Sequence, residues 1–121
     1  MEERRKYPRF ELNLTANYKI VDSEEVFKFG QTKNVSADGI CFESEEFLKP
    51  GTYVELEVDL RDANPSIHIV GEVRWSVPEN PRKERYHNGL RVVGMPLTDE
   101  NRFLKYYCDK MVDKLSEYLK L

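Results

Sequence analysis

The pattern that most constrains this fold is a strict alternation of apolar and polar residues in two separate segments. Every second residue is apolar or aromatic between Leu12 and Ile20, and the same pattern returns between Val54 and Leu60. A period of two is typical of a strand with one buried face, whereas an amphipathic helix repeats every 3.6 residues. Both segments are therefore predicted to be half-buried strands rather than helices.

Four further segments are rich in β-forming residues and lie between turn signals. They are Val26–Val35, Ile40–Ser44, Ile67–Trp75 and Gly89–Val93. We expect Val26–Val35 to pair back antiparallel on the first strand, and a loop with Pro78 and Pro81 to precede the last. Alternation in Ile67–Trp75 places Trp75 on the same side as its apolar residues, Ile67, Ile69, Gly71 and Val73. Six short antiparallel strands, each with one apolar face, predict an all-β fold curled into a small barrel.

The C-terminal segment changes from strand to helix periodicity at Thr98, a residue suited to an N-cap and followed by Asp99 and Glu100. One apolar stripe follows, made of Leu104, Tyr107, Cys108, Met111, Val112, Leu115, Tyr118 and Leu119. We therefore divide the chain into an arm (1–11), a barrel (12–97) and an amphipathic helix (98–121). The helix either packs on the barrel or serves self-association.

Composition and charge limit the classes of protein that fit. A chain of 121 residues suits one domain, and a net charge of −3 argues against a general nucleic-acid binder. No signal peptide and no apolar run long enough to span a bilayer are visible, so a cytoplasmic location without membrane insertion is expected. No catalytic set is apparent, and two cysteines with His68 and His87 lack zinc-ligand spacing, so neither an enzyme nor a metal or cofactor is predicted.

Two motifs point to an anionic ligand. Arg5 and Arg9 lie four residues apart in a basic arm, where Pro8 disfavours a helix, and guanidinium groups can each bind a phosphate by two N–H bonds. The segment Asn34-Val35-Ser36-Ala37-Asp38-Gly39 has the short polar side chains and the glycine of a hydrogen-bonding turn. Each motif alone also fits an ordinary tail or turn, but their coincidence favours a receptor for a small anionic ligand.

These residues resemble the PilZ domain family. Arg5-Lys6-Tyr7-Pro8-Arg9 is similar to its RxxxR element, and Asn34 to Gly39 to its [D/N]xSxxG element; Gly71–Trp75 and Gly89–Val92 resemble its later strands. The resemblance implies a six-stranded antiparallel PilZ-type β-barrel with a C-terminal helix, a bacterial receptor that binds cyclic di-GMP.

The resemblance also implies roles for particular residues. Arg5 and Arg9 would bind phosphates and the Hoogsteen edge of guanine, and Asn34, Ser36 and Gly39 would hold the other side of the ligand. Trp75 is similar to an aromatic position that contacts guanine in some members, and core and stacking roles both stay open for it. Arg4 lies where members differ in binding one ligand or an intercalated pair, so the stoichiometry is also open.

The expected mode of action is ordering of the arm on binding, with the signal passed to a protein partner. The family suggests motility, pilus or exopolysaccharide machinery as partners, and a homodimer through the helix is a further option. Two other functions are weighed: a barrel for single-stranded nucleic acid with Tyr53, Trp75 or Tyr86 as stacking residues, and a PilZ-like protein-interaction module without ligand.

Overall fold

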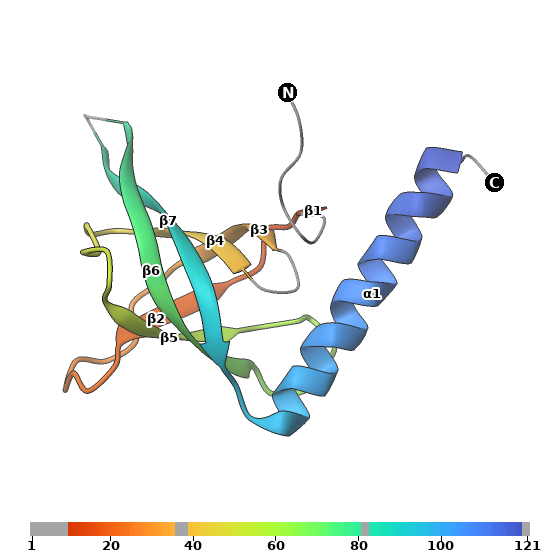
Figure 1. Ribbon diagram of the computed structural model, residues 1–121, viewed down its shortest axis with the longest axis horizontal. Coiled ribbons are helices and arrows are strands. Elements are labelled where there is room, and N and C mark those ends of the chain that lie inside the picture. The colour runs from red at the N-terminus through yellow and green to blue at the C-terminus, as the bar shows by residue number, and fades with distance from the viewer. Residues whose placement is uncertain (1–9, 36–38, 81–82, 120–121) are drawn as a thin grey trace.

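The computed structural model describes residues 10–35, 39–80 and 83–119 of the chain. The described part forms one antiparallel sheet of seven strands in the order β1-β3-β4-β7-β6-β5-β2, followed by one helix (Figure 1). The elements are β1 (Phe10–Glu11), β2 (Ala16–Ile20), β3 (Gln31–Val35), β4 (Gly39–Ser44), β5 (Tyr53–Val58), β6 (Ile67–Asn80), β7 (Lys83–Gly94) and α1 (Leu97–Leu119).

The sheet curls until its two edges meet. The chain from β1 through β2 pairs first with β3 and then with β5, so it lies between the two ends of the sheet. Backbone hydrogen bonds join it to the segment before and within β3, including Leu12 N to Lys33 O (2.9 Å) and Tyr18 N to Lys28 O (2.9 Å). The predicted antiparallel pairing of residues 12–20 with 26–35 is confirmed by these bonds. Counting β1 and β2 as one bent strand, the predicted six-stranded barrel is confirmed.

The first predicted strand is nevertheless interrupted between β1 and β2. There the buried Thr32 side chain takes the place of regular ladder bonds: its hydroxyl accepts from Leu14 N (2.8 Å) and donates to the Leu12 carbonyl (2.5 Å). One side chain therefore satisfies the backbone where the strand bends from one edge of the sheet to the other.

The core follows the alternation read from the sequence. The inward residues of β2 and β5 are buried, and their partners in β6 are buried too. The least exposed apolar side chains of these strands are Ala16, Tyr18, Val54, Leu56, Ile67, Ile69 and Val73. Burying them removes most of their apolar surface from water, which is the main favourable term for a domain of this size.

The predicted loop with Pro78 and Pro81 is wrong for the residues described. β6 continues to Asn80 and β7 starts at Lys83, so the two strands form a long hairpin that rises above the barrel (Figure 1). Proline lacks an N–H and is excluded from central strands. Pro78 is tolerated because β6 pairs with β5 only as far as Glu72, and Val73 makes the last backbone bonds on that side, to Gly51 and Thr52. Beyond Val73 the backbone of β6 pairs with β7 alone.

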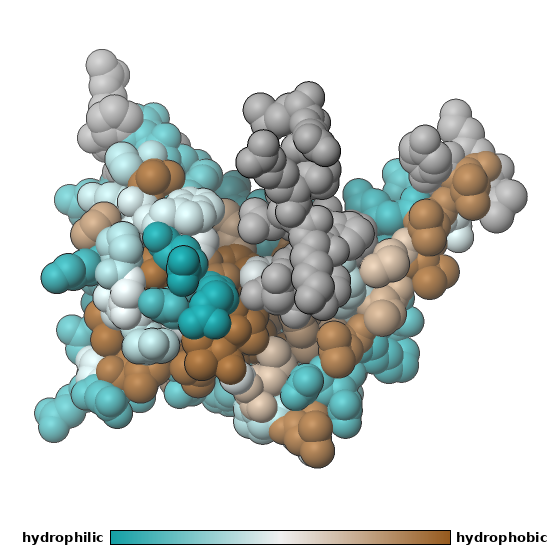
Figure 2. Space-filling view, in the orientation of Figure 1, coloured by the Kyte–Doolittle hydropathy of each residue, from teal (hydrophilic) through white to brown (hydrophobic). Residues whose placement is uncertain are grey.

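The helix α1 contacts the barrel mainly through its first half. Phe103 and Tyr107 are buried, and the Arg102 guanidinium binds both carboxylate oxygens of Asp62 (2.9 and 3.0 Å). From Val112 onward the apolar side chains of the stripe that the structure describes are exposed, and Figure 2 shows apolar surface along this free end. Within the described part of the chain, no helix combines the length and apolar character needed to span a bilayer.

Candidate ligand-binding site

Strand pairing brings four residues into one row on the outer face of the barrel. Asn34 in β3 is opposite Cys41 in β4, Cys41 is opposite Gly89 in β7, and Gly89 is opposite Trp75 in β6. Their neighbours Ile40, Phe42 and Leu90 are buried in the core, so the four residues of the row face outward. We refer to Asn34, Cys41, Gly89 and Trp75 as the outer row.

Two β-bulges place the ends of the outer row on this face. The register of β3 shifts between Thr32 and Asn34, and that of β6 shifts between Val73 and Trp75. A bulge adds one residue to a strand and so reverses which side the following residues face. The expectation that Trp75 shares the side of Val73 is wrong for this reason: Val73 is buried in the core, whereas Trp75 lies outside it.

The indole of Trp75 lies on the backbone of Gly89. A Cβ atom at Gly89 would come within 2.2 Å of the Trp75 Cε2 and Nε1 atoms, so only glycine allows this contact. The ring is still 40% exposed. It borders a hollow of about 180 Å³ whose lining includes Gly39, the last residue of the predicted turn. An exposed, supported aromatic ring beside a hollow is suited to stacking on a flat ligand.

Asn34 occupies the opposite end of the outer row. It lines a second hollow, of about 300 Å³, with Lys33, His87 and Cys41, and Cys41 also lines the hollow beside Trp75. The Asn34 Oδ1 atom is buried and has no hydrogen-bond partner among the described residues. A buried acceptor without a donor is unfavourable, so an N–H group that reached this oxygen would remove an energetic cost.

Three charged residues border the Trp75 end. Arg91 is opposite Gly39 in β4 and opposite Glu72 in β6, and Arg74 is the extra residue of the β6 bulge. Glu72 Oε1 lies 3.0 Å from Arg91 Nη2 and 3.4 Å from Arg74 Nη1. Arg91, and to a lesser extent Arg74, hold the pKa of the Glu72 carboxyl below its usual range.

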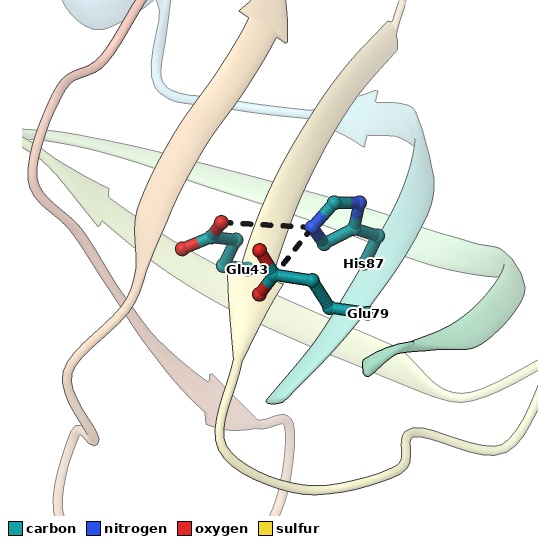
Figure 3. A group of neighbouring side chains, drawn as sticks. All are labelled: Glu43, Glu79 and His87. Atoms are coloured by element: carbon teal, nitrogen blue, oxygen red, sulfur yellow. Dashed lines mark ion pairs between the residues drawn. The ribbon is translucent and has the colours of Figure 1, made fainter. Parts of the chain in front are cut away.

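A second charged group consists of Glu43, Glu79 and His87 (Figure 3), and His87 lines the same hollow as Asn34. His87 Nε2 lies 3.5 Å from Glu43 Oε1 and 3.7 Å from Glu79 Oε2, close enough for the three side chains to share a cation. Glu43 is already paired with Lys33 Nζ (2.9 Å) and Arg85 Nη1 (3.4 Å), and its hydrogen bond raises the pKa of Lys33. The arrangement is that of a charge-paired network across β3, β4, β6 and β7.

The structure brings together three of the seven predicted site residues, Asn34, Gly39 and Trp75. Arg4, Arg5, Arg9 and Ser36 lie outside the described residues, so their roles stay predictions. Arg74 and Arg91 were not predicted as site residues. Arg91 could have been found from its spacing, because residues 89 and 91 of one strand face the same side.

The fold and the outer row define a small barrel with a candidate binding face outside its core. Residues 3–108 match the family model for the PilZ domain. Because this match covers most of the sequence, the chain belongs to the PilZ domain family. A comparison with curated protein sequences found no match.

Solved PilZ structures share the fold at low sequence identity. The inhibitor of motility MotI/DgrA of Bacillus subtilis is 20% identical with a TM-score of 0.70, and the match covers 93% of this chain and 54% of that chain. The PilZ domain of Escherichia coli YcgR, solved with c-di-GMP, is 16% identical with a TM-score of 0.66 and 98% coverage of both chains. A tetrameric Xanthomonas campestris PilZ domain assembled through a helical bundle is 12% identical with a TM-score of 0.69, covering 93% of this chain and 92% of that one. This chain spans about half the length of MotI/DgrA.

Proposed function

We propose that this protein is a non-catalytic receptor for cyclic di-GMP that binds its ligand on the outer row. The observation that carries the proposal is the meeting of Asn34, Gly39 and Trp75 on one face, although they come from three different strands. Family membership supports it, as does the c-di-GMP bound to the YcgR domain of the same fold.

In this proposal each element has a distinct role. Trp75 stacks on a guanine base, and the free Asn34 Oδ1 accepts a hydrogen bond from the ligand. Gly39 lets the ligand approach the backbone, and Ser36 adds a hydroxyl from the same turn. Arg5 and Arg9 bind phosphate from the arm, and Arg4 contributes where a second ligand molecule is bound.

Calorimetric titration with cyclic di-GMP tests the proposal. The wild type should bind, and Arg5→Ala or Arg9→Ala should weaken binding by roughly 30–150-fold, since a charge-assisted hydrogen bond contributes about 2–3 kcal/mol. Lys49→Ala is the matched control, because this exposed cation in the β4–β5 turn lies outside both hollows. A folded wild type that shows no binding heat at high ligand concentration rejects the receptor function.

The single-stranded nucleic-acid alternative is not favoured by the positions of the aromatic residues. Tyr53 and Trp75 both face outward, and Tyr53 is opposite the acidic Glu72. Tyr86 shares the inward parity of Asn88 and packs edge-on against Phe47, with ring centroids 6.0 Å apart. Stacking of successive bases requires aromatic rings along one track. A PilZ-like interaction module that binds no ligand is separated from the receptor by the same titration.

The signal is proposed to leave through ordering of the arm and contact with a protein partner. Hydrogen exchange of residues 1–10 should slow on ligand addition, and an unchanged rate would contradict this route. Motility, pilus or exopolysaccharide machinery supplies the candidate partners, to be identified by a pull-down with and without ligand. The exposed apolar end of α1 supports a homodimer as an additional option, and light scattering of a Leu115→Glu variant tests it.

A further inference from the structure

Two barrel arginines border the same hollow as Gly39 and Trp75. Arg91 is the cross-strand neighbour of Gly39, and Arg74 is the bulge residue next to Trp75. Both line the 180 Å³ hollow. Their positions are set by strand pairing rather than by the arm, so they are fixed relative to the outer row.

Among the described residues, Glu72 is the acidic partner of both guanidinium groups. Arg91 and Arg74 both contact its Oε1 atom, at 3.0 and 3.4 Å. The two arginine side chains are 54% and 59% exposed, and each guanidinium has five N–H donors, so one shared oxygen uses a small part of their capacity. Exposed ion pairs of this kind contribute little to stability, and they are easily exchanged for a better partner.

We infer that Arg91 and Arg74 form a phosphate-binding pair on the barrel and that Glu72 competes with the ligand for them. The inference rests on the proposed function. A cyclic dinucleotide has two phosphates, and a guanidinium matches the geometry of a phosphate by two parallel N–H bonds. The arm arginines bind one phosphate, and the barrel pair binds the other after leaving Glu72.

Glu72 thereby sets the ligand concentration at which the receptor responds. Its carboxylate lies beside the site of the incoming phosphate, so it both occupies the arginines and repels the ligand charge. Removing the carboxylate charge frees the arginines without removing them. The structure therefore predicts that substitutions of Glu72 and Arg91 change the ligand affinity in opposite directions, although the two side chains contact each other.

The experiment is a calorimetric titration of the full chain with cyclic di-GMP. Arg91→Ala should weaken binding by roughly tenfold or more, Arg74→Ala by less, and Glu72→Gln should tighten it several-fold. Arg91→Lys keeps the charge but loses the two parallel N–H donors of the guanidinium. Its affinity should lie between those of Arg91→Ala and the wild type. Lys49→Ala again serves as the control, and thermal unfolding verifies that each variant is folded.

The outcomes separate this inference from the proposed function. If Glu72→Gln and Arg91→Ala weaken binding alike, the three residues form a structural ion pair and the inference is overturned. If Arg91→Ala binds like the wild type while Asn34→Ala or Arg9→Ala does not bind, the receptor function stands and the barrel pair is rejected. If the wild type does not bind cyclic di-GMP, both the receptor function and the barrel phosphate-binding pair are rejected.

Discussion

Two halves of this barrel are built from one sheet but differ in regularity. The β2–β5 and β5–β6 pairings keep one register throughout, with Tyr18, Leu56 and Ile69 stacked on the inner face. The β3–β4 and β6–β7 pairings are broken by bulges beside Asn34 and Trp75. A bulge disrupts the ladder and redirects a side chain, so the irregular half gives up regular pairing to display polar and aromatic groups.

This difference teaches that the regular pairings serve stability alone, whereas the bulged strands serve both tasks. They bury Phe42 and Val73 in the core and display Asn34 and Trp75 outside it. The regular half buries apolar side chains on both of its strand pairings, whereas the bulged half presents the outer row and its flanking charges to solvent. Substitutions of inward residues and of outer-row residues should therefore affect different measurements, unfolding free energy for the first and ligand affinity for the second. The following predictions test that separation.

The largest expected effect is on stability, from Leu56→Ala in the regular half. Leu56 is fully buried, and truncating such a side chain leaves a cavity that costs about 2–5 kcal/mol of unfolding free energy. Chemical denaturation should show this loss, while the affinity of the folded fraction for cyclic di-GMP stays unchanged. Should the variant fail to fold, Leu56→Val provides a smaller step, and Glu57→Gln on the outer face of β5 is the control. A loss of affinity in folded Leu56→Val would refute the separation.

Local pattern was sufficient to predict the regular half. Alternation in residues 12–20 and 54–60 depends only on which face is buried, and pairing preserved that face. The same reasoning failed at Trp75, because a single extra residue, Arg74, reverses the face and no local pattern marks it. Pro78 was misassigned to a loop because its tolerance depends on β5 ending before it reaches this part of β6, which is a property of the relative strand lengths in the sheet.

The candidate site was predictable in the same uneven way. Asn34 and Gly39 were found because the turn motif is contiguous in the sequence. Arg91 was missed because its relevance comes from lying opposite Gly39 across β4 and β7. Cross-strand register is set by the whole sheet, so the pattern of one segment does not predict which residues of two strands lie opposite each other.

The second prediction compares two residues on either side of one bulge. Val73→Ala removes buried methyl groups and should cost about 2 kcal/mol, whereas Trp75→Ala should change the unfolding free energy by less than about 1 kcal/mol. Affinity for cyclic di-GMP should respond in the opposite order, with a loss of roughly 5–150-fold for Trp75→Ala from lost stacking. Equal stability losses would show that Trp75 is a core residue and that the bulge has no functional role.

The third prediction concerns Gly89, which supports the Trp75 ring. Gly89→Ala places a methyl group where the indole lies, so the ring must move off the backbone, at a stability cost of about 1 kcal/mol. Trp75 is the only tryptophan, so its fluorescence reports the displacement directly, and affinity should fall with it. Gly94→Ala is the matched control in the same strand, because its Cβ would meet nothing within 4 Å. Unchanged fluorescence in Gly89→Ala would contradict the packing described for the outer row.

The smallest expected effect is a change in Tm for a substitution of Asp62, which joins the loop after the regular strand β5 to α1. The Arg102 guanidinium holds the pKa of the Asp62 carboxyl below its usual value. A carboxyl with a lowered folded pKa stabilises the protein above its unfolded pKa of about 3.9, and that stability is lost as the pH falls through the folded pKa. Asp62→Asn should therefore lower the Tm slightly near pH 7, and the difference from the wild type should vanish in strong acid.

Thermal unfolding between pH 2.5 and 7 measures this difference, with Asp109→Asn as the control because Asp109 pairs with Lys105 inside the helix. The asparagine keeps the Oδ1 acceptor that Asn64 N uses (3.2 Å), so the turn contact is retained, while the charge and the second acceptor for the Arg102 guanidinium are removed. A difference that persists at pH 2.5 would mean that the charge pair does not connect the helix to the loop. The first half of α1 would then be held by its other contacts, which are the buried Phe103 and Tyr107 and the hydrogen bonds of Asp99 with His68 N and of Arg102 with the Pro65 carbonyl. The irregular half should show no change in cyclic di-GMP affinity in this variant, because Asp62 lies in the loop between β5 and β6 and lines neither hollow of the outer row.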